Sequence, residues 1–242
     1  MGTEDQMKAI YDVSRGIPLQ SRSVLFVMAD NVDRRGTVRA RFTLPRYSLG
    51  LKSVTDLSLG LIALLLFSPV MVAIALAIKI GSQGPIFFRQ RRRGLNGYVI
   101  SVWKFRTMHV CEDGQNIAQA RFDDERVTRI GRYLRRTSVD ELPQLFNVLA
   151  GEMSLVGPRP HAIAHDVYYA ARVADYDRRL TVKPGITGWA QVHGLGGPTA
   201  DLELMRRRVM MDLYYVDNYS IWLDLRILIS TLFVGFLHAN AY

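Results

Sequence analysis

An uncharged stretch over residues 57–78 constrains the fold of this chain more than any other feature. At about 1.5 Å per residue, a straight helix of this length is long enough to cross the hydrocarbon core of a bilayer, which is about 30 Å thick. Ser68 and Pro69 divide the stretch into two equal halves. Because proline inside a helix removes a backbone hydrogen bond and bends the axis, each half would reach only about 16 Å, roughly half of the core.

Basic residues flank the apolar stretch on both sides. Since lysine and arginine near a membrane segment favour the cytoplasmic side, both flanks reach that side only if the segment enters and leaves by the same face. We therefore predict a re-entrant helix-break-helix over residues 53–80, in which Ser68 bonds backbone groups freed by Pro69. A kinked helix that crosses the bilayer is the alternative, and a buried helix of a soluble protein is a weaker one. The flanking residues are Arg34, Arg35, Arg39, Arg41, Arg46 and Lys52 before the stretch, and Lys79, Arg89, Arg91, Arg92, Arg93, Lys104 and Arg106 after it.

Composition bounds the partners of the chain. The 242 residues carry a formal net charge of +9, which indicates an anionic partner such as a membrane surface or phosphorylated substrates. No recognition-helix motif and no interleaved stacking aromatics accompany that charge, so we expect no nucleic-acid partner. The single cysteine, Cys111, excludes an intramolecular disulfide and a multi-cysteine metal site.

The first 45 residues are polar, mixed in charge and without the apolar core of a cleavable signal peptide. We expect residues 1–45 to form a disordered arm and residues 46–242 to form one domain. Residues 86–110 predict short strands. A second apolar run, over residues 227–237, is too short to cross a bilayer and follows Trp222 and Arg226. We predict an interfacial amphipathic helix there, and packing against the domain is an equal alternative.

Two adjacent acids, Asp140 and Glu141, lie between a cluster of arginines and Pro143. Because Pro143 has no N–H to donate, it belongs in a first helical turn, which places Asp140 at or near the N-cap. A second register makes Ser138 the cap and Glu141 its capping-box partner. Either register puts two carboxylates at a helix N-terminus, where anions are favoured. By itself such a pair is more often a helix cap than a catalytic site.

Further basic residues lie in patterns that suit phosphate. Two prolines enclose Arg159 in the sequence Gly-Pro-Arg-Pro at 157–160, which restricts its backbone and suits a fixed guanidinium. Arg129, Arg132 and Arg136 share one face of an expected helix. That face is either solvated or in contact with lipid phosphates, and the sequence leaves both readings open.

Four ordered motifs resemble the bacterial sugar transferase family, the monotopic polyprenyl-phosphate phosphoglycosyl transferases. The resemblance runs from about Pro45 to the C-terminus, without the additional N-terminal spanning helices of larger members. Val139 stands where leucine is common in the family. The motifs are 104–108 (KFRTM), 135–145 (RRTSVDELPQL), 151–160 (GEMSLVGPRP) and 184–192 (PGITGWAQV).

The resemblance implies a reaction and a set of roles. A hexose-1-phosphate, with glucose favoured and galactose next, passes from a UDP-sugar to undecaprenyl phosphate and UMP is released. Asp140 is implied as the nucleophile and Glu141 as the ligand of a Mg²⁺ cofactor. The candidate phosphate contacts are Lys104, Arg106, Arg159 and Arg136.

The resemblance also implies a location and a pathway. The expected fold is a monotopic membrane protein of the mostly helical α+β class, with residues 46–242 as its catalytic domain. That domain is expected on the cytoplasmic face of the bacterial inner membrane, in contact with anionic lipids of the inner leaflet. Its reaction would be the first membrane step of exopolysaccharide or O-antigen synthesis. The sequence leaves the oligomeric state open.

Overall fold

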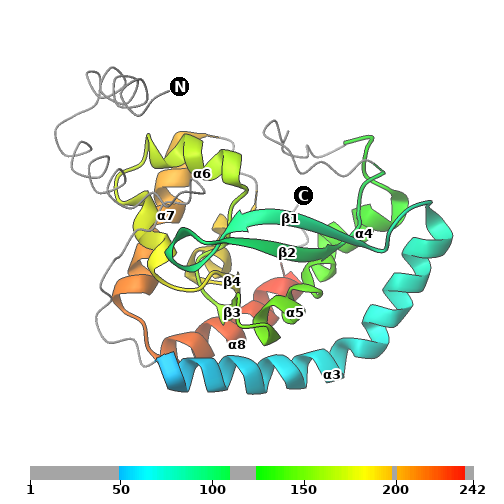
Figure 1. Cartoon of the computed structure of the whole chain (residues 1–242), viewed down its shortest axis with the longest axis horizontal. Coiled ribbons are helices and arrows are strands. Elements are labelled where there is room, and N and C mark those ends of the chain that lie inside the picture. The colour runs from blue at the N-terminus through cyan, green and yellow to red at the C-terminus, as the bar shows by residue number, and fades with distance from the viewer. Residues whose placement is uncertain (1–48, 110–123, 198–200, 238–242) are drawn as a thin grey trace, which may run out of the picture. The chain divides into compact units, whose positions relative to one another are not determined.

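The computed structural model describes residues 49–109, 124–197 and 201–237 (Figure 1). Three features of the sequence lie outside the described residues. They are the expected arm over residues 1–45, the basic flank before Lys52, and the single cysteine, Cys111. Apart from the turn residues Asn96–Tyr98, the described residues belong to one compact unit. They confirm the mostly helical α+β class with short strands.

Six α-helices, three short 3-10 turns, one π-helical turn and two small sheets make up the described residues. The α-helices are α3 (Leu49–Gly81), α4 (Arg129–Thr137), α5 (Gln144–Leu149), α6 (Ile163–Ala170), α7 (Leu202–Asp217) and α8 (Ile221–Leu237). The strands are β1 (Phe87–Arg93), β2 (Val99–Phe105), β3 (Ser154–Val156) and β4 (Gly185–Thr187). The 3-10 turns are η1 (Leu95–Gly97), η2 (Val139–Glu141) and η3 (Tyr176–Thr181), and the π-helical turn is η4 (Gln191–Leu195).

The long helix α3 continues through Pro69 and bends about midway along its length (Figure 1). The Ser68 hydroxyl donates a 2.8 Å hydrogen bond to the Leu65 carbonyl, which is the group that Pro69 leaves without its usual i+4 donor. The predicted hydrogen bond from Ser68 to a backbone group freed by Pro69 is therefore confirmed. The predicted break is a bend within one helix, because the serine hydroxyl replaces the missing donor.

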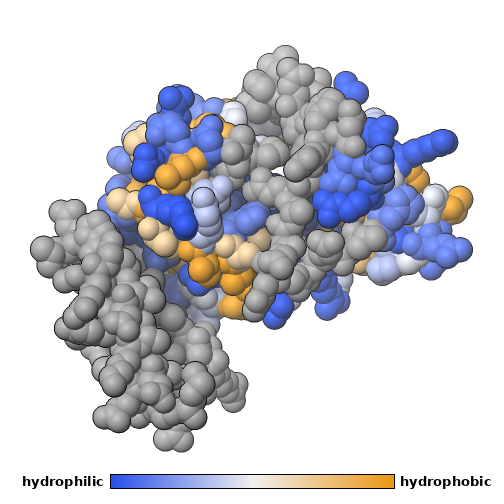
Figure 2. All heavy atoms as spheres, turned by 90° about the horizontal axis from the view of Figure 1, so that it is seen from above, coloured by the Kyte–Doolittle hydropathy of each residue, from blue (hydrophilic) through white to orange (hydrophobic). Residues whose placement is uncertain are grey.

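Most of α3 is apolar and exposed. Among the described residues, Gly50–Gly81 is the one helix long and apolar enough to cross a membrane, and 11% of its most apolar window is buried. A core helix of a soluble protein would be mostly buried instead. Figure 2 shows the molecule from the side opposite the horizontal part of α3 in Figure 1, and hydrophilic residues predominate on the described part of that face.

A buried ion network fastens the beginning of α3 to the rest of the unit. Lys52 Nζ lies 2.7 Å from Asp224 Oδ2 in α8 and 3.5 Å from Asp56 Oδ1. Asp56 Oδ1 also accepts hydrogen bonds from the Ser154 hydroxyl at 3.0 Å and from the Leu155 N–H at 3.1 Å. Lys52, Asp56 and Asp224 are all buried. Lys52, which the sequence placed in a basic flank, is therefore a structural cation that ties α3 to β3 and α8.

We expect Lys52→Met to destabilise the protein by about 3 kcal/mol or more, because Asp56 and Asp224 would stay buried without their cation. For a chain of this size such a loss lowers the Tm by about 6 °C or more. Thermal unfolding of the purified protein in detergent measures this change. Lys79→Met is the matched control, since Lys79 is exposed in the last turn of the same helix. Equal Tm values for the two variants would contradict the structural role of Lys52.

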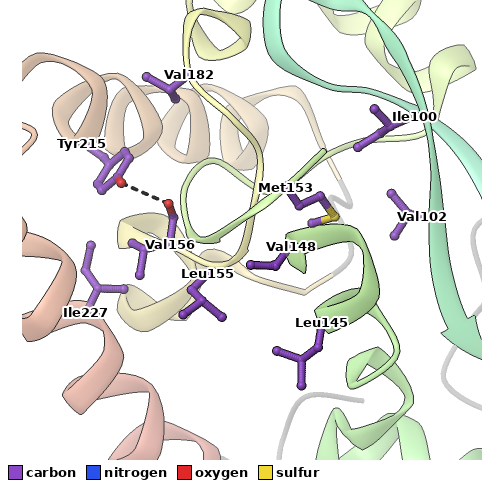
Figure 3. Packing of buried hydrophobic residues seen from close by; sticks show 10 residues of the cluster. All are labelled: Ile100, Val102, Leu145, Val148, Met153, Leu155, Val156, Val182, Tyr215 and Ile227. Atoms are coloured by element: carbon purple, nitrogen blue, oxygen red, sulfur yellow. Dashed lines mark hydrogen bonds between the residues drawn. The ribbon is translucent and has the colours of Figure 1, made fainter. Parts of the chain in front are cut away.

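The two sheets serve different purposes. β1 and β2 form an antiparallel hairpin in which Phe87 pairs with Phe105 and Arg93 with Val99. β3 and β4 pair in parallel and lie within the main hydrophobic core (Figure 3). The Tyr215 hydroxyl of α7 donates to the Val156 carbonyl of β3 at 3.0 Å, as Figure 3 shows. The core residues are Ile100, Val102, Leu145, Val148, Met153, Leu155, Val156, Val182, Tyr215 and Ile227.

The second apolar run lies in α8, which has two unlike faces. One face packs on the core, where Ile227 is fully buried and Thr231 exchanges a 2.7 Å hydrogen bond with Thr187 of β4. The packing alternative is therefore confirmed for this face. The other face is apolar and exposed, and its placement in a membrane surface stays a prediction. Its exposed residues include Trp222, Ile229, Leu232 and Phe233.

Candidate active site

Asp140 and Glu141 lie in the tight turn η2 between α4 and α5. Ser138 ends α4 in the left-handed conformation, with φ 56° and ψ 13°, and reverses the chain into η2. Pro143 is the N-cap of α5, so the prediction that it begins a helix is confirmed. The N-cap position for Asp140 is wrong, because the reversal at Ser138 inserts a separate turn. In the second register, the cap position of Ser138 is confirmed, since it is the N-cap of η2, but the capping box is wrong because the Ser138 side chain makes no cap bond.

Two cations from distant segments hold the carboxylate of Glu141. Lys104 Nζ of β2 donates to Oε1 at 2.6 Å. The Arg159 guanidinium donates to Oε1 at 2.6 Å and to Oε2 at 3.0 Å, which is a bidentate pair. Burial opposes the charge of Glu141, but Arg159 and Lys104 hold its pKa well below the usual range. We call these three residues the Glu141 clamp.

The neighbouring acid, Asp140, takes no part in the bonds of the clamp. Asp140 as a whole residue is 8% exposed to solvent. Burial raises the pKa of Asp140 to about 6, although the charge of Lys104 lowers it. Arg135 and Arg159 also lower this pKa, and the charge of Glu141 raises it. One carboxylate is thus fixed as an anion between two cations, while the other is nearly buried and less strongly paired.

The backbone around Arg159 is held by close contact with β4. The Gly157 N–H donates to the Thr187 carbonyl at 2.9 Å, and the Gly185 N–H donates to the Pro158 carbonyl at 3.0 Å. A Cβ atom on Gly157 would collide with the Lys183 carbonyl and lie 2.9 Å from the Gly185 nitrogen. Glycine at 157 is therefore required by this close approach, which fixes the start of the Gly-Pro-Arg-Pro segment.

A buried ion pair that was not predicted from the sequence holds the backbone carbonyl of Arg159. Arg179 of η3 donates to the Arg159 carbonyl at 2.7 Å. Its Nε lies 2.8 Å from Asp212 Oδ2 of α7, and both side chains are 2% exposed. The two partners lie 33 residues apart in sequence, so no local pattern points to the pair. It orders the carbonyl of the residue whose guanidinium holds Glu141.

The structure places the other two predicted phosphate contacts differently. Arg106 is 2% exposed and donates to the carbonyl and hydroxyl of Ser82, both at 2.9 Å, and to the Gln83 carbonyl. These groups follow the C-terminus of α3, where carbonyls lack helical partners. Arg136 is exposed on α4, whereas its neighbour Arg135 acts on the pKa of Asp140. Lys104 and Arg159 are thus brought to the acids, and Arg106 is engaged elsewhere.

The acids present suit a magnesium ion that shares its ligands with a substrate. In the part of the chain that the structure describes, no three His, Cys, Asp or Glu side chains cluster as a metal site. Mg²⁺ prefers carboxylate oxygens and usually takes one or two of them, with water and substrate phosphate completing its shell. A carboxylate has about four acceptor sites, and Glu141 uses three of them in the clamp. Asp140 lies beside it, outside the clamp.

Comparison with known proteins gives a consistent family. A model of the bacterial sugar transferase family matches residues 47–238. The chain is 52% identical over 192 residues to the UDP-glucose:undecaprenyl-phosphate glucose-1-phosphate transferase of Escherichia coli (strain K12), covering 79% of this chain and 41% of the relative. It is 50% identical over 207 residues to the protein of the same name from Caulobacter vibrioides, covering 85% and 78%. A relative of that name from Klebsiella pneumoniae is 49% identical over 191 residues, covering 79% and 41%.

The matched lengths differ among these relatives. The chain spans about two fifths of the length of the Escherichia coli and Klebsiella proteins. It spans 78% of the Caulobacter protein. Every motif that the sequence analysis singled out lies within the residues matched by the family model.

Proposed function

The chain belongs to the bacterial sugar transferase family, and we propose that it transfers glucose-1-phosphate from UDP-glucose to undecaprenyl phosphate and releases UMP. The names of three relatives that are about half identical to the chain support this donor and this acceptor. Galactose is the next candidate sugar. The reaction would begin the lipid-linked assembly of an exopolysaccharide or O-antigen repeat.

The observation that carries the proposal is the buried Asp140 beside the Glu141 clamp. Phosphoryl transfer depends mainly on positioning and on neutralising phosphate charge. Lys104 and Arg159 are fixed in place by their bonds to Glu141, so their charges are already oriented when a diphosphate arrives. Asp140 is a carboxylate nucleophile that these charges keep ionised near neutral pH, against its burial.

The proposed reaction has two steps. In the first, an Asp140 oxygen attacks the phosphorus that bears the sugar, and the bond from that phosphorus to the bridging oxygen breaks. UMP leaves, and a phosphosugar-aspartate remains. In the second, a phosphate oxygen of undecaprenyl phosphate attacks the same phosphorus, and the bond to Asp140 breaks. The carboxylate is restored, so that one difficult step becomes two easier ones.

Charge must be balanced because both substrates and Asp140 are anionic. Lys104 and Arg159 face the acids directly, and Arg135 lies near enough to lower the pKa of Asp140. A Mg²⁺ ion held by Glu141, with Asp140 beside it, would supply further neutralisation of the diphosphate. When phosphate enters, Lys104 and Arg159 can share their donors between Glu141 and the substrate.

A polyprenyl acceptor requires the site to lie at a bilayer surface. The re-entrant placement of α3 is supported by its two ends, which both contact the same compact unit. Near its start, Lys52 pairs with Asp224. Just beyond its end, the Ser82 carbonyl binds Arg106. The basic flanks favour the cytoplasmic face.

Cysteine labelling tests this topology. In a Cys111→Ser background, Gly50→Cys and Lys79→Cys place exposed thiols near the two ends of α3. We expect an impermeant maleimide added to inside-out vesicles to label both, and the same reagent added to intact spheroplasts to label neither. Glu203→Cys, at an exposed position of α7, reports the side of the catalytic domain. Labelling of the two α3 thiols from opposite sides would show a helix that crosses the bilayer.

The pH dependence of the first step tests the link between Lys104 and Asp140. Burial raises the pKa of Asp140 to about 6, so the rate of UMP release without acceptor should fall as the pH drops through about 6. Removing the acceptor avoids its own phosphate monoester, which also titrates near 6. Lys104→Gln removes a charge that lowers this pKa, so it should lower the rate and move the falloff to higher pH. An unmoved falloff, as expected for Lys79→Gln, would contradict the link.

The substrate assignment is tested by UMP release from a panel of UDP-sugars with undecaprenyl phosphate in detergent. UDP-glucose should give the highest kcat/KM, with UDP-galactose second. Equal rates from all donors, or turnover that continues beyond one UMP per enzyme without undecaprenyl phosphate, would contradict the proposal.

A further inference from the structure

A second site lies outside the Glu141 clamp, where the segment after β4 meets α8. A cavity of about 230 Å³ opens there. Its walls combine apolar and polar side chains, and none of them belongs to the clamp. The lining residues are Trp189, Val192, His193, Arg226, Ser230 and Phe233.

The cavity is continuous with the exposed apolar face of α8. Trp222, Arg226, Ile229 and Phe233 recur at spacings of three and four residues, which puts them on one stripe of the helix. Trp222 is 81% exposed and Phe233 is 64% exposed. An arginine thus interrupts an apolar stripe at the point where the stripe borders the cavity.

The Arg226 guanidinium is available to bind an anion. Its guanidinium lies 5.5 Å from the centre of the Trp189 ring, which is a cation–π contact. Within residues 49–109, 124–197 and 201–237, no carboxylate forms an ion pair with Arg226. A cation on an apolar surface is normally paired or kept at an aqueous boundary. Here the aromatic contact positions the charge without neutralising it.

The remaining polar groups sit on the same walls. The His193 ring packs against Trp189 with centroids 4.1 Å apart, and its Nδ1 lies 2.8 Å from the Trp189 carbonyl. Ser230 lies one turn after Arg226 and supplies a hydroxyl. Trp189 itself is stacked on Tyr214 of α7, with ring centroids 5.4 Å apart. This contact holds the Trp189 ring in place. A guanidinium, an imidazole and a hydroxyl next to an apolar stripe suit an amphipathic anion.

We propose that this cavity binds the phosphate of an anionic phospholipid of the bilayer, with the acyl chains lying along the exposed stripe of α8. The inference rests on the membrane placement proposed above but not on the transfer reaction. Because the cavity shares no residue with the clamp, a lipid bound there is not consumed. It would hold α8 at the headgroup level, with Trp222 and Phe233 in contact with lipid.

Site-specific photolabelling tests the proposal. The full chain is reconstituted in phosphatidylcholine nanodiscs that contain a small fraction of phosphatidylglycerol with a photoreactive acyl chain, and labelled peptides are mapped by mass spectrometry. We expect labelling of α8 and of residues 186–197, as well as of α3. Arg226→Gln should lower the labelling of α8 about fivefold, the effect of one cation near an anionic surface, and leave labelling of α3 and UMP release unchanged.

Arg172→Gln is the matched control, because Arg172 is also exposed and lies over an aromatic ring, Tyr168, at 3.8 Å. It should leave labelling of α8 unchanged, and an equal loss in both variants would overturn the site. Unlabelled phosphatidylglycerol should compete, whereas inorganic phosphate should not. Stronger competition by undecaprenyl phosphate would overturn the phospholipid assignment. Absence of labelling on α3 would refute the membrane placement, whereas labelling of α3 without α8 would refute this inference alone.

Discussion

Asp140→Asn should lower turnover by about 10³-fold or more, the scale expected when a covalent nucleophile is lost. The amide has nearly the shape of the carboxylate but is a far weaker nucleophile. Lys104 and Arg159 keep Glu141 as their anionic partner, so the arrangement of the site should survive. Steady-state UMP release with saturating donor and acceptor measures the loss.

The same substitution should not destabilise the protein at pH 8. Burial raises the pKa of Asp140 from 3.8 to about 6, so the folded state binds this proton more tightly than the unfolded state does. Ionisation of Asp140 therefore costs folding free energy, fully above pH 6 and progressively less towards pH 4. The asparagine variant avoids that cost, so its Tm should match or exceed the wild-type value at pH 8, with the difference shrinking as the pH falls.

Asp177→Asn provides a matched control, because burial also raises the pKa of Asp177 and its residue is not part of the clamp. This variant should retain turnover. Substantial turnover in purified Asp140→Asn would contradict the nucleophile assignment, and a large drop in its Tm would show that the loss of activity reflects misfolding.

Glu141→Gln should lower kcat/KM by about 100-fold and raise the Mg²⁺ concentration for half-maximal rate by about tenfold or more. Loss of the carboxylate removes the charge that holds Lys104 and Arg159. It also removes the proposed metal ligand, and changes at metal sites commonly cost 10–100-fold in metal affinity. The measurement is a Mg²⁺ titration of UMP release for both proteins.

Glu203→Gln is the control for charge alone. Glu203 also lies near two arginines, Arg206 at 3.7 Å and Arg207 at 3.6 Å, but on the solvent-exposed surface of α7. Exposed pairs of this kind contribute little, so this variant should behave as wild type. A Glu141→Gln enzyme with reduced rate and an unchanged Mg²⁺ response would limit Glu141 to holding the two cations.

Features set by neighbouring residues were predictable from the sequence. The bend of α3 follows from Pro69, and the Ser68 hydroxyl satisfies the carbonyl freed one turn before it. Arg159 is restricted by the prolines on either side of it, and the structure brings it to Glu141. The bend of α3 and the restricted backbone of Arg159 each have a cause within four residues, whereas the contact of Arg159 with Glu141 spans 18 residues of sequence.

Features set by distant partners were not predictable in the same way. Arg135 lowers the pKa of Asp140, whereas Arg136, its neighbour on α4, is exposed. Lys52 resembles other basic residues of the flank, but its partner Asp224 lies 172 residues away. Arg106 lies in one of the four motifs that resemble the family, yet its guanidinium binds the carbonyls that follow α3. Only tertiary packing distinguishes these cations from those that reach the acids.

The central claim, a covalent intermediate on Asp140, is tested most directly by intact-protein mass spectrometry after incubation with UDP-glucose and Mg²⁺ in the absence of undecaprenyl phosphate. We predict that the wild-type protein gains the mass of one glucose phosphate less one water, that this adduct maps to Asp140, that a matching amount of UMP is released, and that the adduct is lost when acceptor is added. Asp140→Asn should do none of these. No adduct and no UMP until acceptor is present would contradict the claim and indicate direct transfer between the two substrates.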